Sequence, residues 1–411
     1  MFLTSRKRIK RMDTRSNRLI QNIFRCYETQ LKSKRLPVKH LQAIDAIVSC
    51  RTADRGTSVY HCDAEDKTVS VHHACKHRSC WLCAQKRRFN WVEAQQSRLL
   101  DCAHFHAVFT LPEEYRVLWR YNQRWFTHAL FSSVSSVLQD LFQQRHDIAP
   151  GLLLALHTWG RQLSLHPHIH CVVSAGGLDS KGQWSEVGKY LLPGKQVMAL
   201  YRGRLQARLK EAFEDGEIRL PEDKDVKWFD RLHQQVYRKS WCVRIEPKYA
   251  HGRGVMRYLS RYLRGGPINP GQIKQCDSSG IGFQYKDHRD QRRKLMRLKP
   301  EEFLRRMLLH VPEKGVHTVR HYGLYAGASR DKRNRCREVV GGLMEHIEVE
   351  SEQKTGLLCG CGAPLRELVT IRPWRRKKGI SNRKGLASIY VQQVDEPDIG
   401  QGKKMITALR L

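Results

Sequence analysis

Two histidines separated by one residue offer the most specific chemistry in this sequence. His168 and His170 lie in the run 166–170 (His-Pro-His-Ile-His), and the apolar residues 171–173 follow directly. Within a β-strand, residues i and i+2 face the same side. The two imidazoles therefore project together, whereas Ile169 faces the opposite side. Neighbouring imidazoles of this kind bind a divalent metal ion when a third ligand lies near them.

The third ligand of such a site is open at the level of sequence. His157, Gln162 and His166 all lie close by along the chain, and the sequence does not choose among them. A bound Mg²⁺ or Mn²⁺ ion with open coordination positions would hold a scissile phosphate and polarise it. The alternative is a histidine pair that packs in its strand without a metal.

Two tyrosines four residues apart, Tyr258 and Tyr262, could act as nucleophiles. On a helix, residues i and i+4 lie on one face with Cβ atoms ~5–6 Å apart, so both phenols would reach the same place. Arg257, Arg261 and Arg264 surround them and could bind DNA phosphates or lower the pKa of a phenol. Tyrosine can attack phosphorus covalently, although aromatic pairs at this spacing also serve as packing residues.

A cluster of cysteines predicts a structural zinc site. Five of the 13 cysteines lie between Cys50 and Cys83, and Cys80 and Cys83 are separated by two residues. Structural zinc takes four Cys or His ligands in a tetrahedron, and we assign Cys75, Cys80 and Cys83 with Cys62 as the fourth. The rivals for the fourth position are Cys50, His73 and His77. The basic residues expected to face DNA phosphates around this cluster are Lys76, Arg78, Lys86, Arg87 and Arg88.

The charge of the chain indicates a polyanionic partner. The sequence has 74 Lys and Arg against 40 Asp and Glu among 411 residues, a formal charge of +34 and a pI of about 10.0. Residues 1–40 alone hold 12 basic residues against Asp13 and Glu28, which predicts a DNA-contacting arm. No apolar run approaches the ~20 residues that cross a bilayer, so we expect no membrane partner.

The separate pair Cys359 and Cys361 forms at most half of a metal site.

The predicted elements suggest an α+β fold with a mostly antiparallel sheet. Apolar runs predict strands at 104–111, 152–156, 169–173, 241–245 and 282–286. Helical periodicity predicts helices at 113–145, 194–214, 254–263 and 300–310. Gly176 and Gly177 predict a turn after the histidine strand.

The order and spacing of these motifs resemble the HUH superfamily of single-strand DNA nucleases. More closely, the chain is similar to a rolling-circle transposase of the two-tyrosine type, in the group named after insertion sequence ninety-one. The stretches that carry the resemblance are 109–112, 157–160, 166–170, 258–262, 311–316, 320–324 and the cysteine cluster. Two positions depart from the family pattern: Glu65 stands where a second cysteine of a Cys-x-x-Cys pair is expected, and Arg161 stands where Gln is expected.

This resemblance implies an HUH-type central antiparallel sheet flanked by helices and preceded by a small Cys-rich zinc-binding domain. It implies His168 and His170 as metal ligands, Tyr258 and Tyr262 as nucleophiles, and Cys75, Cys80 and Cys83 as zinc ligands. The expected division is 1–45 for a basic N-terminal helical arm, 46–100 for the zinc-binding domain, 101–330 for the catalytic domain and 331–411 for a basic C-terminal tail.

The implied activity is that of a transposase that nicks and rejoins single-stranded DNA at transposon ends through a 5′-phosphotyrosine. Its partners would be single-stranded and transposon-end DNA, its cofactors Mg²⁺ or Mn²⁺ and structural Zn²⁺, and its location the bacterial cytoplasm, with the nucleoid. A rolling-circle replication initiator and a conjugative relaxase share this chemistry. A non-catalytic zinc-dependent DNA-binding regulator is the alternative from another class.

Overall fold

The protein divides into two compact units, each built from segments that are distant in the sequence. The large unit comprises residues 1–48 and 76–347, and the small unit comprises residues 49–75 and 348–411. Residues of the predicted zinc-binding segment 46–100 thus belong to both units. The computed structural model describes residues 16–188, 191–249, 266–287, 289–340, 357–372 and 391–392.

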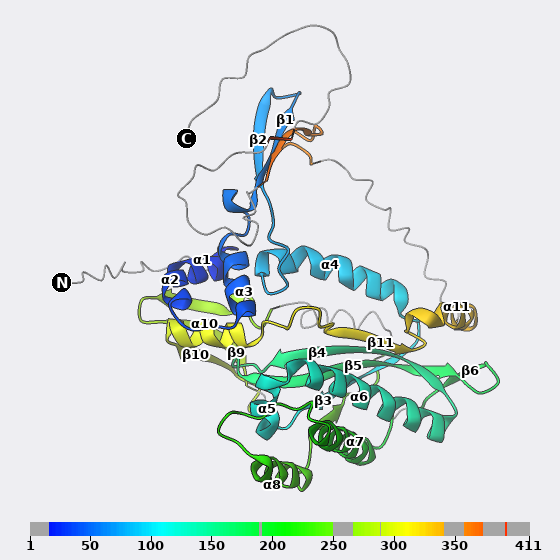
Figure 1. Cartoon of the computed structure of the whole chain (residues 1–411). Coiled ribbons are helices and arrows are strands. Elements are labelled where there is room, and N and C mark those ends of the chain that lie inside the picture. The colour runs from blue at the N-terminus through cyan, green and yellow to red at the C-terminus, as the bar shows by residue number, and fades with distance from the viewer. Residues whose placement is uncertain are drawn as a thin grey trace. The chain divides into compact units, whose positions relative to one another are not determined.

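An antiparallel sheet forms the centre of the large unit (Figure 1). Its strands are β3 (His104–Thr110), β4 (Ala149–Trp159), β5 (Leu165–Leu178), β7 (Val243–Ile245) and β11 (Val319–Gly323), with β6 (Trp184–Glu186) paired to the end of β5. The strand order is β11-β4-β5-β3-β7. All these neighbours are antiparallel, so the predicted α+β fold with a mostly antiparallel sheet is confirmed.

Helices cover one face of this sheet and enclose the main apolar core. They are α5 (Arg116–Tyr121), α6 (Gln123–His146), α7 (Gly194–Glu214) and α8 (Val226–Tyr237). The helix predicted over 194–214 is confirmed with the same bounds. The one predicted over 113–145 is interrupted at Asn122, where a short 3-10 turn (Glu113–Tyr115) and α5 precede α6. The Asn122 side chain donates to the carbonyls of Leu118 and Arg219, and it accepts from the Arg219 N–H, which explains the break.

The opposite face of the sheet packs against α4 (Trp81–Arg98) and α11 (Arg330–Val339). Strand alternation separates the two faces. In β4, Leu152 and Leu154 enter the main core, whereas Leu153 and Ala155 face the α4 side. In β5, Ile169 enters the main core, so His168 and His170 project on the α4 side, as predicted from their spacing.

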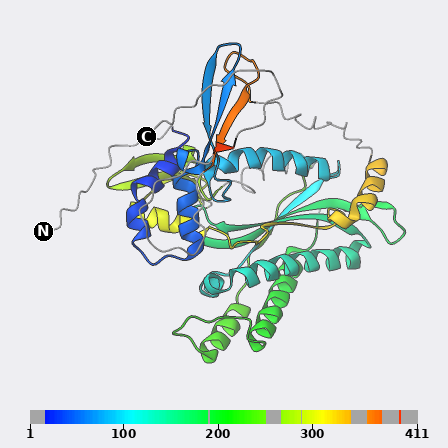
Figure 2. The same ribbon diagram turned by 45° about the horizontal axis from the view of Figure 1, so that its top comes forward.

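The remaining elements of the large unit form a helical and sheet group at one end of the central sheet. Figures 1 and 2 show α1 (Leu19–Cys26), α2 (Glu28–Lys32) and α3 (Val38–Val48) beside α10 (Pro300–Leu309) and the sheet β10-β9-β8. The bounds of these strands are β8 (Ile273–Asp277), β9 (Gly280–Lys286) and β10 (Arg293–Leu298). Lys39 on α3 pairs with Glu313 after α10 (Nζ to Oε1, 2.5 Å), and Gln30 on α2 donates to Glu301 (2.8 Å).

The small unit is a four-stranded antiparallel sheet in the order β13-β12-β1-β2. β1 (Thr57–Cys62) and β2 (Lys67–His72) form a hairpin, and β12 (Arg366–Ile371) and β13 (Val391–Gln392) complete the sheet. His61 lies opposite Arg366. The sheet therefore joins a strand from the first seventy residues to one from the last fifty.

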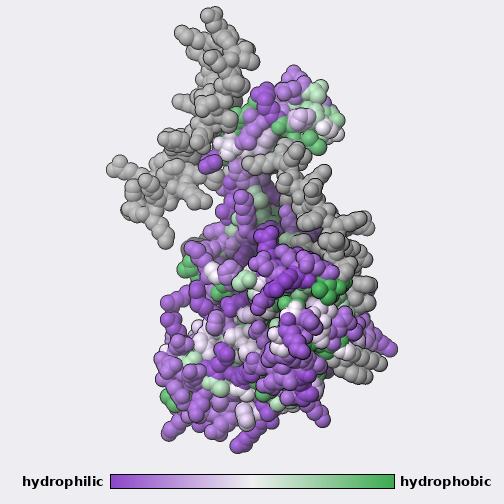
Figure 3. Space-filling model, turned by 90° about the vertical axis from the view of Figure 1, so that its right-hand side faces the viewer, coloured by the Kyte–Doolittle hydropathy of each residue, from purple (hydrophilic) through white to green (hydrophobic). Residues whose placement is uncertain are grey.

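The visible surface is largely hydrophilic, and its apolar residues lie in small separate patches (Figure 3). None of the helices in the described ranges is long and apolar enough to cross a membrane.

The turn predicted at Gly176 and Gly177 is wrong, because β5 continues through both residues to Leu178. The glycines are required there by close packing rather than by a turn. A Cβ on Gly176 would lie 2.6 Å from the ring of Trp184, and a Cβ on Gly177 would lie 2.3 Å from the carbonyl oxygen of Ala149.

This packing predicts that Gly177→Ala lowers the free energy of unfolding by about 1–3 kcal/mol, because the added methyl group meets backbone that cannot move freely. Gly203→Ala is the matched control, since a Cβ on this α7 residue meets no atom within 4 Å. It should raise the free energy of unfolding by about 0.5–1 kcal/mol. Urea unfolding measures both changes, and equal effects would contradict the packing argument.

Candidate metal-binding sites

Three histidines meet on the α4 side of the central sheet. β4 and β5 place His157 directly opposite His168, and His170 follows two residues later on the same face. One ring nitrogen from each lies within 4.8 Å of the others. The ring of His157 is 4.5 Å from that of His170 and 5.4 Å from that of His168, measured between centroids. The sheet thus gathers three imidazoles around one point.

Hydrogen bonds orient the two predicted ligands. His168 donates from Nδ1 to the carbonyl of His166 (2.6 Å), and His170 Nδ1 is bonded to His106 Nε2 (2.9 Å), with the two rings stacked. When His170 donates this second bond, both Nε2 atoms carry lone pairs, and these atoms lie 3.1 Å apart. Two adjacent octahedral ligands at about 2.1 Å from an ion lie about 3.0 Å apart. The residues therefore fit a divalent cation.

Burial keeps these imidazoles neutral, which is the form that binds a metal. It lowers the pKa of His168 to about 4 and holds that of His170 well below its ordinary value, with the charges of neighbouring histidines adding to the effect. It also lowers the pKa of His106 to about 4. Neutral ligands leave the positive charge of a bound ion available to a phosphate.

Of the three candidates for the third ligand, only His157 places a ring nitrogen within 4.8 Å of the ring nitrogens of both His168 and His170. The amide of Gln162 is exposed and donates to the hydroxyl of Tyr285 (3.0 Å). The ring of His166 lies 3.5 Å from a guanidinium nitrogen of Arg116. His157, in contrast, is 2% exposed and stacks on Trp159. Sequence reasoning could not make this choice, because it depends on the register between two strands.

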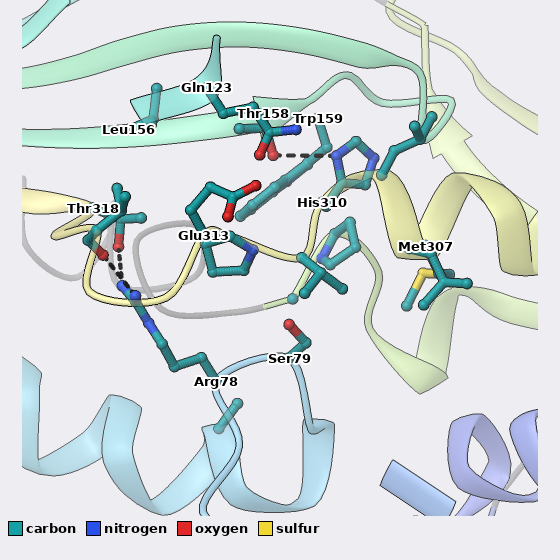
Figure 4. A pocket seen from close by; sticks show the side chains of 18 of the residues that line it. Arg78, Ser79, Gln123, Leu156, Thr158, Trp159, Met307, His310, Glu313 and Thr318 are labelled. Carbon is teal, nitrogen blue, oxygen red and sulfur yellow. Dashed lines mark hydrogen bonds between the residues drawn. The ribbon is translucent and has the colours of Figure 1, made fainter. Parts of the chain in front are cut away.

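A cavity of about 140 Å³ is lined in part by Trp159, whose ring stacks on that of His157. Figure 4 shows Thr158 hydrogen-bonded to Nδ1 of His310 (3.1 Å), whose Nε2 is bonded to the carbonyl of Leu163. Arg78 extends from the turn before α4 and donates to the Val316 carbonyl and the Thr318 hydroxyl. The wall thus combines an aromatic face with fixed polar groups.

The predicted nucleophiles and their arginines lie outside the described residues. Tyr258, Tyr262, Arg257, Arg261 and Arg264 all fall between positions 249 and 266.

The residues on either side of that interval belong to the large unit. Tyr249 exchanges two backbone hydrogen bonds with His104 on β3, and Gly266 lines the cavity beside Trp159.

The predicted zinc ligands divide between two local arrangements. In the small unit, the Cys75 N–H points at Cys50 Sγ (3.5 Å). In the large unit, Cys80 occupies the N-cap position of α4 without a side-chain capping hydrogen bond, and Cys83 lies in the first turn of the helix. A helix N-terminus favours thiolates. Arg87 braces this turn by donating to the carbonyls of Lys76, His77 and Cys83. Arg78 and Arg87, expected to face DNA, are therefore engaged within the large unit.

Cys62 does not lie with Cys75. Thr57 pairs with His72 at one end of the hairpin, and Cys62 pairs with Lys67 at the other. Five residues of strand separate these ends by roughly 17 Å. Cys62 instead has Cys361 as its neighbour, with the two Sγ atoms 3.6 Å apart. His73 is bonded to Ser58 (2.9 Å), and Nδ1 of His77 accepts from the Ser79 N–H.

The structure shows a basic helix where sequence reasoning predicted only a tail. In helix α11, Arg333 is buried and donates to the carbonyls of Leu324 and Ala326, which anchors the helix. Its exposed basic residues are Arg330, Lys332 and Arg335. The local signal was the run of basic residues from 330 to 337.

Comparison with known proteins identifies the family. A family model described as "Putative transposase" matches residues 151–333, and one described as "Transposase zinc-binding domain" matches residues 11–111. The chain is 30% identical over 339 residues to "Putative transposase y4qJ" of Sinorhizobium fredii, which covers 80% of this chain and 85% of that protein.

A second relative is the transposase for insertion sequence element IS801 of Pseudomonas savastanoi pv. phaseolicola, 30% identical over 329 residues, covering 75% of this chain and 76% of that protein. The chain therefore belongs to the transposase family of insertion sequence ninety-one. The predictions of a transposase and of a zinc-binding domain are confirmed.

Among solved structures, the metal-bound form of conjugative relaxase TrwC in complex with oriT DNA matches with a TM-score of 0.21 and 12% identity. The match covers 38% of this chain and 69% of that chain. A similarity of this size supports no argument about mechanism.

The geometry predicts which residue completes the histidine site. His157→Ala should weaken Mn²⁺ binding by at least about tenfold, because it removes a nitrogen ligand. Gln162→Ala and His166→Ala should change it by no more than about twofold, since the His168 bond to residue 166 uses the backbone carbonyl. Isothermal titration calorimetry on the full chain measures all three variants. A larger loss in either of the last two would reassign the ligand.

Proposed function

We propose that this transposase nicks and rejoins single-stranded DNA at transposon ends through a 5′-phosphotyrosine. The observation that carries the proposal is the convergence of His157, His168 and His170, with two Nε2 atoms 3.1 Å apart. A buried set of neutral imidazoles is suited to a divalent cation of the Mg²⁺ or Mn²⁺ type. When bound, such an ion supplies Lewis acidity that polarises the scissile phosphate.

The protein's own groups would hold and orient the reacting atoms. His168 and His170 would be fixed by the His166 carbonyl and by His106, so neither ring needs to reorganise during the reaction. The aromatic and polar wall formed by Trp159, Thr158 and His310 suits an unstacked base next to the phosphate. These contacts would position the DNA strand rather than alter its charge.

Tyr258 and Tyr262 would supply the nucleophiles. A phenolate oxygen attacks the phosphorus, the bond from phosphorus to the 3′ oxygen breaks, and that oxygen takes a proton to leave a free 3′-OH. The 5′ phosphate stays on the tyrosine, so the bond energy is kept for rejoining. A second tyrosine, predicted from its spacing to lie on the same helix face, would allow another strand to be cut while the first is occupied. The segment's neighbours, Tyr249 and Gly266, lie at β3 and at the cavity.

Structural zinc and basic surfaces would complete the DNA-binding apparatus. Cys75, Cys80 and Cys83 are proposed zinc ligands, and Cys50, which lies beside Cys75, is the preferred fourth. Arg257, Arg261 and Arg264 would contact phosphates near the nucleophiles, and the exposed basic residues of α11 would add further phosphate contacts. Phosphate contacts give affinity without sequence information. The proposed location is the bacterial cytoplasm, with the nucleoid as the source of DNA.

A nicking assay with labelled single-stranded transposon-end DNA tests the metal step. His170→Ala should abolish cleavage while leaving DNA affinity within about threefold, because affinity comes from Lys and Arg contacts to phosphates. Chelation by EDTA should have the same effect. His128→Ala, an exposed histidine on α6, is the matched control and should cleave normally. Cleavage that survives both the substitution and EDTA would exclude the proposed metal role.

The tyrosines are tested by trapping the covalent adduct on denaturing gels. Phe at either position removes only a hydroxyl, so packing is kept and the test addresses chemistry. The double variant Tyr258→Phe/Tyr262→Phe should form no adduct, whereas each single variant should keep one cleavage or nick without transferring the strand.

Tyr121→Phe serves as the matched control, because this tyrosine is 51% exposed on α5. It should retain full activity. A DNA-binding regulator without catalytic activity predicts no adduct with any form of the protein. If the DNA adduct mapped to another tyrosine, such as Tyr322, the enzyme class would stand, but Tyr258 and Tyr262 would be rejected as the nucleophiles.

A further inference from the structure

A second group of metal-ligand side chains lies within the small unit, at the tip of the β1–β2 hairpin. It combines Cys62 and Glu65 from the hairpin with Cys359 and Cys361 from the C-terminal part of the chain. The transposase activity uses none of these residues. One ligand atom from each lies within 4.8 Å of all the others. Residues almost 300 positions apart therefore meet around a single point.

The distances within this group are those of tetrahedral zinc ligands. Cys62 Sγ lies 3.6 Å from Cys361 Sγ, and Cys359 Sγ lies 3.3 Å from Glu65 Oε2. Ligands at about 2.3 Å from a tetrahedral Zn²⁺ lie about 3.8 Å apart, and a shorter bond to a carboxylate oxygen reduces that value. A disulfide would need about 2.05 Å between sulfur atoms, so the arrangement matches a metal better.

Two tight turns present these ligands to each other. The first is the hairpin turn that follows Cys62, where Asp66 adopts φ +47°. The second follows Cys359, whose N–H donates to the Ala363 carbonyl while the Gly362 N–H donates back to the Cys359 carbonyl. Gly362 has φ +89°, which favours glycine. This turn leads directly into β12, which pairs with β1 and so fixes the approach of the cysteines.

Burial and charge also support a bound cation. Cys62 and Cys359 are buried, whereas Cys361 and Glu65 are exposed, so the group opens to solvent on one side. Three sulfur atoms and one carboxylate are a soft, anionic donor set, and this set favours Zn²⁺ over Mg²⁺ or Mn²⁺. Lys67 lies 3.7 Å from Glu65 Oε2 and is the nearby cation that would lose this partner on metal binding.

We propose that Cys62, Glu65, Cys359 and Cys361 bind a second structural Zn²⁺ ion that fastens β12 to the β1–β2 hairpin. This site is separate from the zinc proposed for the Cys50, Cys75, Cys80 and Cys83 group, because Cys62 and Cys75 lie at opposite ends of the hairpin. The ion would hold the C-terminal strand in the small unit. Glu65 occupies the fourth position, so the Cys-x-x-Glu turn is a working variant of a Cys-x-x-Cys turn.

Thiol alkylation of the zinc-loaded full chain tests the site without substitution. Cys361 is exposed, so without metal it should react with N-ethylmaleimide about as fast as the exposed Cys242. A bound zinc should slow Cys361 by at least about tenfold and leave Cys242 unchanged. A chelator should then equalise the two, as measured by mass spectrometry. Equal rates before chelation, or protection that a disulfide reductant removes, would overturn the proposal.

Zinc content separates this site from the first. The full chain should carry about two Zn²⁺ ions, and either Cys361→Ser or Cys80→Ser should leave about one. A chain with one zinc, lost in Cys361→Ser and kept in Cys80→Ser, would support this site and reject the other. The reverse result would overturn this proposal alone. Cys242→Ser is the matched control and should keep both ions.

A variant that adds a thiolate ligand tests the site without relying on a loss of binding, which misfolding could also cause. Glu65→Cys should bind Co²⁺ with a fourth thiolate, which intensifies the sulfur-to-cobalt absorption and shifts the visible bands to longer wavelength. Ala64→Cys, one position away in the same turn, is the control and should leave the spectrum unchanged. Identical spectra for Glu65→Cys and the unaltered chain would show that Glu65 is not a ligand and overturn the proposed set.

Discussion

The antiparallel register between β4 and β5 is the constraint on which the histidine site depends. It places His157 opposite His168, and a shift of one residue would turn His157 to the other face of the sheet. Both faces are buried here, by α6 and α7 on one side and by α4 on the other, so such a shift would also move Leu152 and Leu154 out of the main core and put Leu153 and Ala155 in their place. The apolar core thus fixes the ligand geometry as a consequence of its own packing.

Burial gives these imidazoles their chemistry as well as their position. Desolvation disfavours the charged form, so His168 and His170 stay neutral and keep lone pairs for a cation. When His170 donates from Nδ1 to His106, two lone pairs 3.1 Å apart repel each other, and the hydrogen bonds to His106 and to the His166 carbonyl hold them there. Packing of the sheet holds the two Nε2 atoms at this distance, and a bound ion would relieve the repulsion between them.

Local patterns in the sequence predicted most of what is local in the structure. The strand with His168 and His170 on one face and the helix over 194–214 follow from periodicities of two and 3.6 residues. The third ligand depends on strand register, the break at Asn122 on hydrogen bonds to Arg219, and the glycines of β5 on contacts with Trp184 and Ala149. These depend on residues distant in the chain, which no local pattern describes.

The two proposed metal sites differ in how far apart their ligands lie in the sequence. His157 and His170 are joined by one β-hairpin, whereas Cys62 and Cys361 are 299 residues apart. In the unfolded chain, closing the longer loop costs about 3 kcal/mol more conformational entropy than closing the shorter one. Pairing of β12 with β1 offsets part of this cost, but β12 has only six residues, of which three are exposed and three are half-buried. A metal at the tip would add stabilisation where the strand begins, since metal binding by a site absent from the unfolded chain contributes directly to folding.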